Sequence, residues 1–401
     1  MAVYASYWTL LLFACMFSAL ALPGDVSSNV SGNFTGKGRS LIILLDEETG
    51  KLFIDQITTD TLKSGLTNVF LPIIYIIVLV VGLPTNAMAV WVLLFRSKKI
   101  HPAAIYMGNL ALADLMFVIW MPLKIAYHLK GNNWTFGEGM CKVFIGFFYG
   151  NMYCSILFIT CLSIQRYWVC AHPLSQQRKN TKFAIIVSLC IWIFISVSTT
   201  PLYLYQQTVE ITDLNITTCH DVSVVSTKNF ESGDILLDVQ LPYYYFMVMA
   251  GLVFFIPMLI IIAAYILLLR ALGSSTVEGS AGKTRQRAVV LIVTVLVTFL
   301  VCFIPSNVML VVHYTLLRNG WANNGYGFYI LTLCLTSLNS CLDPFIYYYV
   351  SDDFREQVKN TLLCRSSRTV ERMRVSFSSM KYSKRTKTYT SSTGNTESSN
   401  C

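Results

Sequence analysis

Seven long apolar segments dominate the middle of the chain, and short polar stretches separate them. Each segment is long enough to cross about 30 Å of hydrocarbon as a helix that rises 1.5 Å per residue. The predicted spans are 69–95, 104–128, 139–171, 183–205, 241–269, 286–316 and 327–350. This pattern predicts an all-α membrane protein, built as a seven-transmembrane helix bundle over residues 69–350.

The region before the first span divides into two parts. Residues 1–21 have an apolar core and end in Ala19, Leu20 and Ala21, which is typical of a cleaved signal peptide. Because Lys and Arg are missing before the core, an uncleaved anchor is the alternative. Residues 22–68 are rich in Gly, Ser, Thr and acids, and they predict a flexible extracellular ectodomain.

Charged residues in the loops predict the orientation. The loops after the first and third spans and before the sixth are basic, whereas residues 206–240 hold six acids and one Lys. By the positive-inside bias, the N-terminus lies outside and the tail inside. In the tail, 351–401, residues 352–363 alternate charged and apolar positions, which predicts a short amphipathic helix on the membrane. Cys364 follows it as a candidate palmitoylation site.

Composition excludes several classes of protein. The chain is 54% hydrophobic and 13% charged, whereas about a quarter of residues are charged in a soluble domain. Most of the 12 cysteines lie in apolar runs, where they pack as small hydrophobic residues, so a disulfide-rich secreted scaffold is excluded. The net charge of +9 is explained by basic residues that we expect at the membrane's cytoplasmic face. We therefore expect membrane lipid as a partner, and no nucleic acid.

Two carboxylates lie inside predicted spans, Asp114 and Asp343, and ionisable groups at that depth are costly. With Ser155 and two asparagines they predict a polar pocket that holds water or a small hard cation on oxygen ligands. We expect no cofactor, apart from a structural sodium ion at this pocket. A hydrogen-bonded packing cluster without an ion, or one proton shared between the two carboxylates, is the alternative.

Motifs in every span resemble those of rhodopsin-like G-protein-coupled receptors. They are Asn86 after Gly82–Thr85, LALAD at Leu110–Asp114, Arg166 and Tyr167, Trp192, Pro257, FLVCFIP at Phe299–Pro305, and DPFIY at Asp343–Tyr347. Three positions depart from the family pattern: Gln165 replaces an acid, Phe303 a Trp and Asp343 an Asn. The loss of the acid removes an ion-pair partner of Arg166, so the inactive state must rest on other contacts.

This resemblance implies a signalling mechanism. The expected activation switch comprises Arg166, Phe303, Pro305, Pro344 and Tyr347. Heterotrimeric G proteins, receptor kinases and arrestins are the implied partners. The many Ser and Thr residues of the tail, among basic residues, are the expected phosphorylation sites.

Further motifs resemble the protease-activated receptors within that family. They are GNNW at Gly131–Trp134, FFYGNMYCSILF at Phe147–Phe158, NITTCHDV at Asn215–Val222 and SCLDPFIYY at Ser340–Tyr348. Gly36–Ile42 resembles their activation site, which implies cleavage after Arg39 by a trypsin-like serine protease. The new N-terminus would act as a tethered ligand comprising Ser40, Leu41, Ile42, Ile43, Leu44 and Leu45.

The resemblance also implies several sites at the outer face. Ligand contact is implied for Tyr75, Asp221, His313, Tyr314 and Tyr329, and the position of His128 at the outer end of the second span adds it as a candidate. A disulfide between Cys141 and Cys219 is implied, with two free thiols as the alternative. N-glycosylation is expected at the sequons of Asn29, Asn33 and Asn215.

The residues around Arg39 explain in chemical terms how cleavage there would produce a ligand. An apolar run, 41–45, follows Arg39 in an otherwise polar region, and cleavage would create an ammonium on Ser40 near an acidic loop. Tethering would raise the ligand's effective concentration to about millimolar. A receptor for a diffusible peptide is the alternative. We expect no enzyme, since the chain lacks a G-x-S-x-G motif, and no transporter, since its prolines do not repeat.

Overall fold

The computed structural model describes most of the helical part of the chain and pieces of the region before it. The described residues are 42–46, 51–54, 56–96, 101–171, 181–204, 206–211, 214–219, 223–226, 236–273, 281–318, 326–350, 354–356 and 358–359. Nine predicted site residues lie outside these ranges: Asn29, Asn33, Arg39, Ser40, Leu41, Asp221, Cys364 and the signal-peptide residues Ala19 and Ala21.

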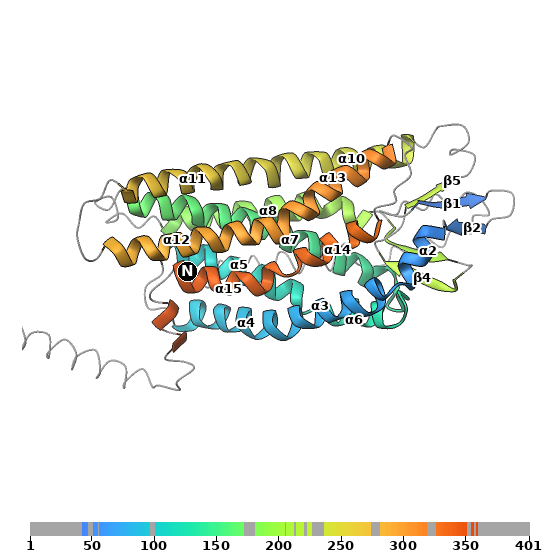
Figure 1. Ribbon diagram of the computed structural model, residues 1–401, viewed down its shortest axis with the longest axis horizontal. Coiled ribbons are helices and arrows are strands. Elements are labelled where there is room, and N and C mark those ends of the chain that lie inside the picture. Colours follow the sequence, from blue (N-terminus) through green and yellow to red (C-terminus); the bar gives the residue numbers. More distant parts are fainter. Residues whose placement is uncertain are drawn as a thin grey trace, which may run out of the picture. The chain divides into compact units, whose positions relative to one another are not determined.

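Seven helices in the described part of the chain are long and apolar enough to cross a membrane, which confirms the predicted seven-helix bundle (Figure 1). They comprise Leu66–Trp91, Pro102–Leu129, Gly137–Ala171, Thr181–Leu204, Tyr243–Ala271, Ala288–Leu316 and Tyr326–Tyr349. Their ends lie within a few residues of those that the apolar pattern predicts.

Several spans are built from more than one helical element, and the elements labelled η are short π-helices. The first contains η1 (Leu66–Phe70), α3 (Leu71–Ile77), η2 (Val78–Gly82) and α4 (Leu83–Trp91), and η3 (Val92–Arg96) follows it. The second contains α5 (Pro102–Val118) and α6 (Met121–Leu129). The third and fourth are the single helices α7 (Gly137–Ala171) and α8 (Thr181–Leu204).

The last three spans are also interrupted. The fifth contains α10 (Leu236–Met249), η5 (Ala250–Phe255) and α11 (Ile256–Gly273). The sixth contains α12 (Ala281–Thr298), η6 (Phe299–Phe303) and α13 (Ile304–Arg318). The seventh contains α14 (Tyr326–Thr336) and α15 (Asn339–Val350), which are separated by a two-residue turn at 337–338.

Proline explains where η1, η2, η5 and η6 occur, whereas no proline directly follows η3. Pro72, Pro84, Pro257 and Pro305 are each the second residue of an α-helix that directly follows an η element. A proline has no N–H to donate, and its ring clashes with the carbonyl four residues earlier. A wide π-type turn before the proline accommodates that clash while the span continues.

Helix α7 forms the centre of the bundle. It packs against α5, α8 and α11, and 83% of its most apolar window is buried, more than in any other span. On the outer faces of the other spans, large apolar side chains stay exposed, among them Val80, Leu259 and Leu300. That distribution fits helices whose outer faces contact lipid rather than water.

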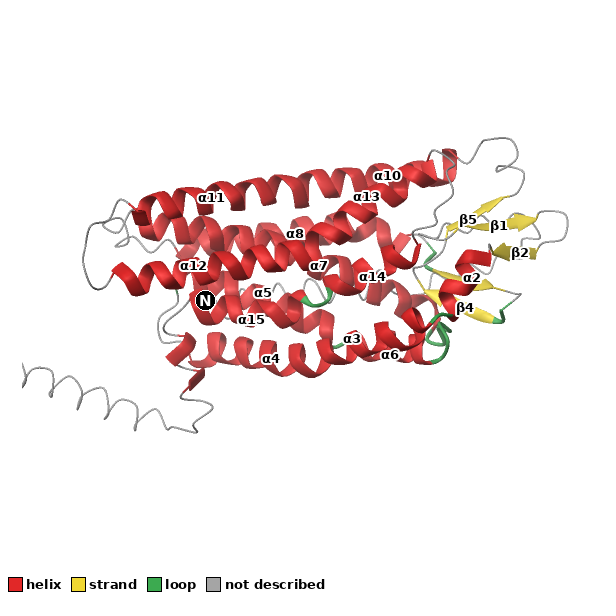
Figure 2. Cartoon of the chain, in the orientation of Figure 1, coloured by secondary structure: helices red, strands yellow, loops and turns green. Residues whose placement is uncertain are grey.

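Short strands gather at one end of the bundle, hereafter the strand-bearing end (Figure 2). β3 (Thr208–Ile211) and β4 (Ile216–Cys219) form an antiparallel hairpin. A second sheet has the order β2-β1-β5, formed by β2 (Lys51–Ile54), β1 (Ile42–Asp46) and β5 (Ser223–Ser226). Helix α2 (Gln56–Lys63) then leads into the first span. The described part of the predicted flexible ectodomain therefore has regular structure.

The chain divides into two units, 1–351 and 352–401. The first holds the bundle and both sheets. In the second, the described residues 354–356 and 358–359 have helical backbone and lie within the predicted amphipathic helix, 352–363.

Candidate functional site

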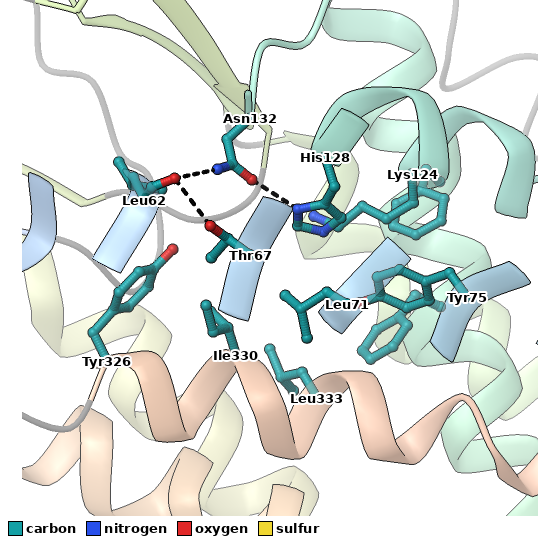
Figure 3. Close-up of a pocket in the computed structure, with 12 residues that line it drawn as sticks. Leu62, Thr67, Leu71, Tyr75, Lys124, His128, Asn132, Tyr326, Ile330 and Leu333 are labelled. Carbon is teal, nitrogen blue, oxygen red and sulfur yellow. Dashed lines mark hydrogen bonds between the residues drawn. The ribbon is translucent and has the colours of Figure 1, made fainter. Parts of the chain in front are cut away.

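A pocket at the strand-bearing end lies between the first, second, third and seventh spans and the segment that precedes the first span (Figure 3). Most of its lining is apolar or aromatic, and polar groups stand on the side of α2 and α6. The lining residues are Leu62, Thr67, Leu71, Tyr75, Lys124, His128, Asn132, Phe144, Phe148, Tyr326, Ile330 and Leu333. A mostly apolar pocket with a few convergent polar groups is the usual form of a ligand site.

Asn132 links the polar groups of this pocket. It has a left-handed backbone with φ of 63°, a conformation that asparagine tolerates better than most residues. Its amide nitrogen donates to the Leu62 carbonyl at 2.7 Å, and its amide oxygen lies 2.7 Å from Nδ1 of His128. The Thr67 hydroxyl donates to the same Leu62 carbonyl at 2.9 Å (Figure 3). Asn132 thus joins the segment before the first span to the pocket histidine.

Two predicted ligand-contact residues meet in this pocket. The rings of Tyr75 and His128 stack with their centroids 5.6 Å apart and their planes 13° from parallel. Both side chains are buried. Lys124 is buried beside them, with its ammonium 4.5 Å from the centre of the Tyr127 ring, close enough for a cation–π contact. The pocket therefore combines aromatic faces, an imidazole and a positive charge.

The other three described candidates form a second aromatic cluster. His313 stacks on Tyr329 at 4.7 Å, and Tyr314 stacks on Phe246 at 4.8 Å. His313 also meets Tyr314 edge to face at 5.3 Å. All four side chains are almost fully buried, so in this structure they pack inside the bundle. Asp221, the remaining candidate, lies outside the described residues.

Sequence reasoning missed the residues that complete the pocket. Leu62 and Thr67 fall in the predicted flexible ectodomain, 22–68, and the sequence singles out Asn132 only as part of the GNNW motif. Lys124 had a detectable signal, because it is an ionisable residue inside an apolar span. The argument applied to Asp114 and Asp343 would also have selected it.

The covalent link at this end is confirmed. Cys141 in α7 and Cys219 in β4 form a disulfide with their Cα atoms 5.8 Å apart. The carboxylate of Glu138, one turn earlier in α7, accepts hydrogen bonds from the backbone N–H groups of Gln207 and Thr208, both at 2.8 Å. The hairpin β3–β4 is therefore held against the third span by a covalent bond and a charged anchor.

Asp114 organises a second polar site in the middle of the bundle. It accepts hydrogen bonds from Asn151 at 2.7 Å, Ser340 at 2.9 Å and Tyr347 at 3.4 Å. Asn339 donates to Ser155 at 3.0 Å nearby. The buried carboxyl group of Asp343 lies beside Asp114 and meets no other hydrogen-bonding side chain among the described residues. The structure thus brings together the acids, Ser155 and asparagines predicted to form a polar pocket.

The predicted switch residues lie along the third, sixth and seventh spans. Phe303 ends η6 and packs edge to face on Phe299 at 5.2 Å, and Pro305 follows it in α13. Pro344 lies inside α15, and Tyr347 reaches Asp114 from the same helix. Arg166 lies near the end of α7 remote from the disulfide. Tyr347 thus contacts the interior polar site, and Arg166 lies toward the end of the bundle opposite the strands.

Comparison with known proteins gives matches along almost the whole chain. Residues 85–347 match the family described as 7 transmembrane receptor (rhodopsin family). Proteinase-activated receptor 2 of Bos taurus is 52% identical over 383 residues, which cover 93% of this chain and 94% of that protein. Proteinase-activated receptor 2 of Homo sapiens is 50% identical over 395 residues, 96% of each chain. Proteinase-activated receptor 1 of Xenopus laevis is 41% identical over 305 residues, 76% of this chain and 69% of that protein.

Proposed function

Because the chain belongs to the rhodopsin family of seven-transmembrane receptors, and within it to the proteinase-activated receptors, we propose that a trypsin-like serine protease activates it by cutting after Arg39. The chain is a G-protein-coupled receptor of the plasma membrane, and a signalling receptor rather than an enzyme. In the proposed mechanism, the new N-terminus from Ser40 is a tethered agonist.

The position of the residues behind the cut carries this proposal. β1 begins at Ile42, two residues after Ser40, and it lies at the strand-bearing end (Figure 1). From β1 the chain continues through β2 and α2 to Leu62, which lines the pocket. The candidate agonist is therefore attached to the receptor through a segment that forms one wall of the candidate site.

The pocket and the buried aromatic cluster offer aromatic and apolar contacts to an apolar peptide. Tyr75 and His128 offer stacked rings in the pocket, and His313, Tyr314 and Tyr329 form the neighbouring cluster. In this proposal Asp221, in the acidic loop, pairs with the new ammonium of Ser40. Such a charged hydrogen bond contributes about 1.5–3 kcal/mol.

Replacing Arg39 by Ala tests the cleavage site, and Lys37→Ala two residues earlier is the matched control. Trypsin should trigger intracellular calcium release in cells that carry Lys37→Ala and not in cells that carry Arg39→Ala. Both variants should respond to added Ser-Leu-Ile-Ile-Leu-Leu, because the free peptide needs no cut. The mature N-terminus of the responding receptor should be Ser40. A normal trypsin response from Arg39→Ala would contradict the proposal.

Coupling to heterotrimeric G proteins follows from the family. We propose that the signal passes through Phe303, Pro305, Pro344 and Tyr347 to Arg166. A tethered agonist cannot diffuse away, so signalling has to be terminated by a step other than loss of the ligand. Receptor kinases that phosphorylate the Ser and Thr residues of the tail, followed by arrestin binding, would supply it.

The interior site fits a sodium ion. Asp114, Ser155 and Asp343 offer hard oxygen ligands, and the two acids lie side by side and fully buried. The ion would neutralise a buried negative charge, which is costly when it has no compensating positive charge. We propose these three residues as its ligands. Removing sodium should then lower the thermal stability of the purified receptor, and Asp114→Asn should abolish that dependence.

The proposed topology places the strand-bearing end outside the cell. A signal peptide at 1–21, glycans on Asn29, Asn33 and Asn215, and a palmitoyl group on Cys364 belong to the same proposal. Asn215 lies in the turn region between β3 and β4 and has a left-handed φ of 50°. Exposed turns of this kind accept glycans without loss of sheet pairing.

A further inference from the structure

Two basic residues lie in the tether, the segment 40–65 between the proposed cut and the first span. They are Lys51 and Lys63. A trypsin-like protease cuts after Lys as well as after Arg, and a cut after either residue would separate Ser40 from the membrane-spanning bundle. The activating enzyme therefore has to cut after Arg39 and leave both of these bonds intact.

The bond after Lys63 is vulnerable by sequence. Lys63 ends α2 and its side chain is exposed. Ser64 and Gly65 follow it, and exposed connections of small and polar residues are preferred places for proteolytic nicking. Protection has to come from the backbone, because a protease binds its substrate as an extended strand and a folded segment must open before it is cut.

Three side chains converge on the carbonyl of Leu62, the residue before Lys63, and together they form what we call the carbonyl clamp. The donors are the amide of Asn132 at 2.7 Å, the hydroxyl of Thr67 at 2.9 Å and the amide of Asn68 at 3.1 Å. A backbone carbonyl has two lone pairs, so this one is saturated. Because Asn132 lies in the loop between the second and third spans, the clamp joins the tether to the bundle (Figure 3).

The other side of the same bond is held within the tether. The backbone N–H of Ser64 donates to the Thr61 carbonyl at 3.1 Å, and the Ser64 hydroxyl donates to the same oxygen at 2.6 Å. Thr61 also approaches α14 closely, since a Cβ built on Gly327 would lie 3.4 Å from its methyl carbon. Exposing the Lys63–Ser64 bond as an extended strand therefore breaks contacts on both sides of it.

The bond after Lys51 is held in a different way. Lys51 is the first residue of β2 and lies opposite Asp46 in the antiparallel pairing with β1. None of the hydrogen bonds of the carbonyl clamp involves β2. Cutting after Lys51 is therefore an internal comparison for cutting after Lys63.

We propose that the Lys63–Ser64 bond is a guarded protease site, and that the carbonyl clamp keeps the tether whole while the activating protease cuts after Arg39. This inference rests on the proposed function and adds a regulation of its agonist. Hydrolysis of the guarded bond consumes one water and leaves a carboxylate on Lys63 and an ammonium on Ser64. The released piece carries the agonist away, so opening of the clamp converts an activating enzyme into an inactivating one.

The N-termini that trypsin creates on the full-length receptor in cells test the guard, and mass spectrometry identifies them. In wild type, the terminus at Ser40 should appear at least about tenfold faster than the terminus at Ser64. Synthetic peptides of residues 34–46 and 56–66, which are too short to fold alone, should be cut after Arg39 and Lys63 at comparable rates. Equal rates in the receptor, or a second peptide that resists trypsin, would overturn the proposal.

Two variants open the clamp from different elements. Asn132→Gly removes one donor and keeps a residue that accepts the left-handed φ, and Thr67→Val removes another donor with little change of shape. At equal surface level, each should speed the appearance of the Ser64 terminus by about tenfold, because the loss of one buried hydrogen bond raises the population of the open segment by about that factor. An unchanged rate in both variants would overturn the guard.

Lys130→Ala is the matched control in the same loop. It removes the bond of the Lys130 ammonium to the Thr135 hydroxyl at 2.9 Å and leaves the clamp untouched, so the rate at Ser64 should stay at the wild-type value. The terminus at Leu52, which reports cutting after Lys51, should appear at the same rate in wild type and in all three variants. A parallel rise at Leu52 and Ser64 in the clamp variants would mean general unfolding of the tether and would overturn a specific guard.

Lys63→Gln connects the second cut to signalling. Added to Asn132→Gly, it should abolish the Ser64 terminus and prolong the calcium response to trypsin, whereas alone it should change neither. An unchanged response of the double variant, despite loss of the Ser64 terminus, would overturn the inactivating role. The proposed function fails separately: a wild-type receptor that is cut after Arg39 and stays silent, although the free peptide activates it, would contradict the tethered agonist, while the positions of the cuts would still test the guard.

Discussion

The two sheets at the strand-bearing end are held in different ways. The hairpin β3–β4 is fixed to the third span by the disulfide between Cys141 and Cys219 and by the carboxylate of Glu138. A further bond joins the hairpin to the loop before that span, because the backbone N–H of Trp134 donates to the Thr217 carbonyl at 2.7 Å. The sheet β2-β1-β5 is defined by backbone pairing, between the neighbouring strands β1 and β2 and between β1 and the distant strand β5.

This difference predicts that the two sheets resist opening to different degrees. A covalent bond and a charged anchor keep one hairpin in place across the end of the bundle, where it can serve as a scaffold. Backbone pairing binds an apolar segment with moderate strength and with a defined register. The sheet β2-β1-β5 is therefore expected to open more readily than the hairpin β3–β4.

Breaking the disulfide should have the largest effect. Cys141→Ser and Cys219→Ser should each strongly reduce surface delivery, because loss of a native disulfide costs about 2–5 kcal/mol. The double variant should be no worse than either single one, since both remove the same bond. Surface levels of the three variants, measured by antibody labelling, check this. Clearly additive losses would mean that the two thiols act separately.

Removing the charged anchor should have a smaller effect on the same hairpin. Glu138 also accepts a bond from the Thr208 hydroxyl at 2.6 Å, so Glu138→Ala leaves three donors without their acceptor. We expect a loss of about 1–2 kcal/mol, seen as a drop in the melting temperature of the purified receptor.

Two variants control for the loss of charge. Glu138→Gln keeps one acceptor oxygen and should fall between wild type and Glu138→Ala. Lys142→Ala removes the ion-pair partner of Glu138, which lies 3.4 Å away at a partly exposed position, and should change stability by less than about 0.5 kcal/mol. A Lys142→Ala loss as large as that of Glu138→Ala would show that the ion pair, and not the backbone anchor, stabilises the hairpin.

The sequence predicts the bundle well because each span has its own local signal. A membrane helix satisfies its backbone hydrogen bonds internally, so an apolar run of sufficient length identifies it without knowledge of its neighbours. The buried acids Asp114 and Asp343 also have such a signal, since charge inside an apolar run stands out. The interior polar site and the seven spans are therefore predictable from the chain alone.

The strand-bearing end is less predictable because its contacts are non-local. The apolar run at 41–45 was interpreted as a ligand, and nothing near it in the chain indicates a partner at 223–226. Asn132 is a second example, because its role depends on Leu62, 70 residues away. Pairing between distant segments leaves no periodic pattern in either one, so local rules cannot find it.

The bridge made by Asn132 should contribute about 1–2 kcal/mol to stability, through the hydrogen bonds of a buried side chain to Leu62, Asn68 and His128. Asn132→Gly removes these bonds and keeps a residue that accepts the left-handed φ, whereas Asn132→Ala removes them and adds backbone strain of about 1 kcal/mol. Thermal unfolding of the purified receptor should rank wild type above Asn132→Gly, and Asn132→Gly above Asn132→Ala. Equal stability of wild type and Asn132→Gly would show that the bridge contributes nothing.

The smallest expected effect lies in the sheet held by backbone pairing. Lys51 in β2 is directly opposite Asp46 in β1, and an opposite-charge pair across two strands contributes about 0.2–1 kcal/mol. Lys51→Glu places like charges opposite each other and should speed amide hydrogen exchange in β1 by roughly two- to fivefold, while Lys51→Gln should change it less. Exchange in β3 and β4 should stay unchanged in both variants, because other contacts anchor that hairpin. Equal acceleration in both sheets would mean that they open together, and the distinction between an anchored hairpin and a sheet held by backbone pairing would then fail.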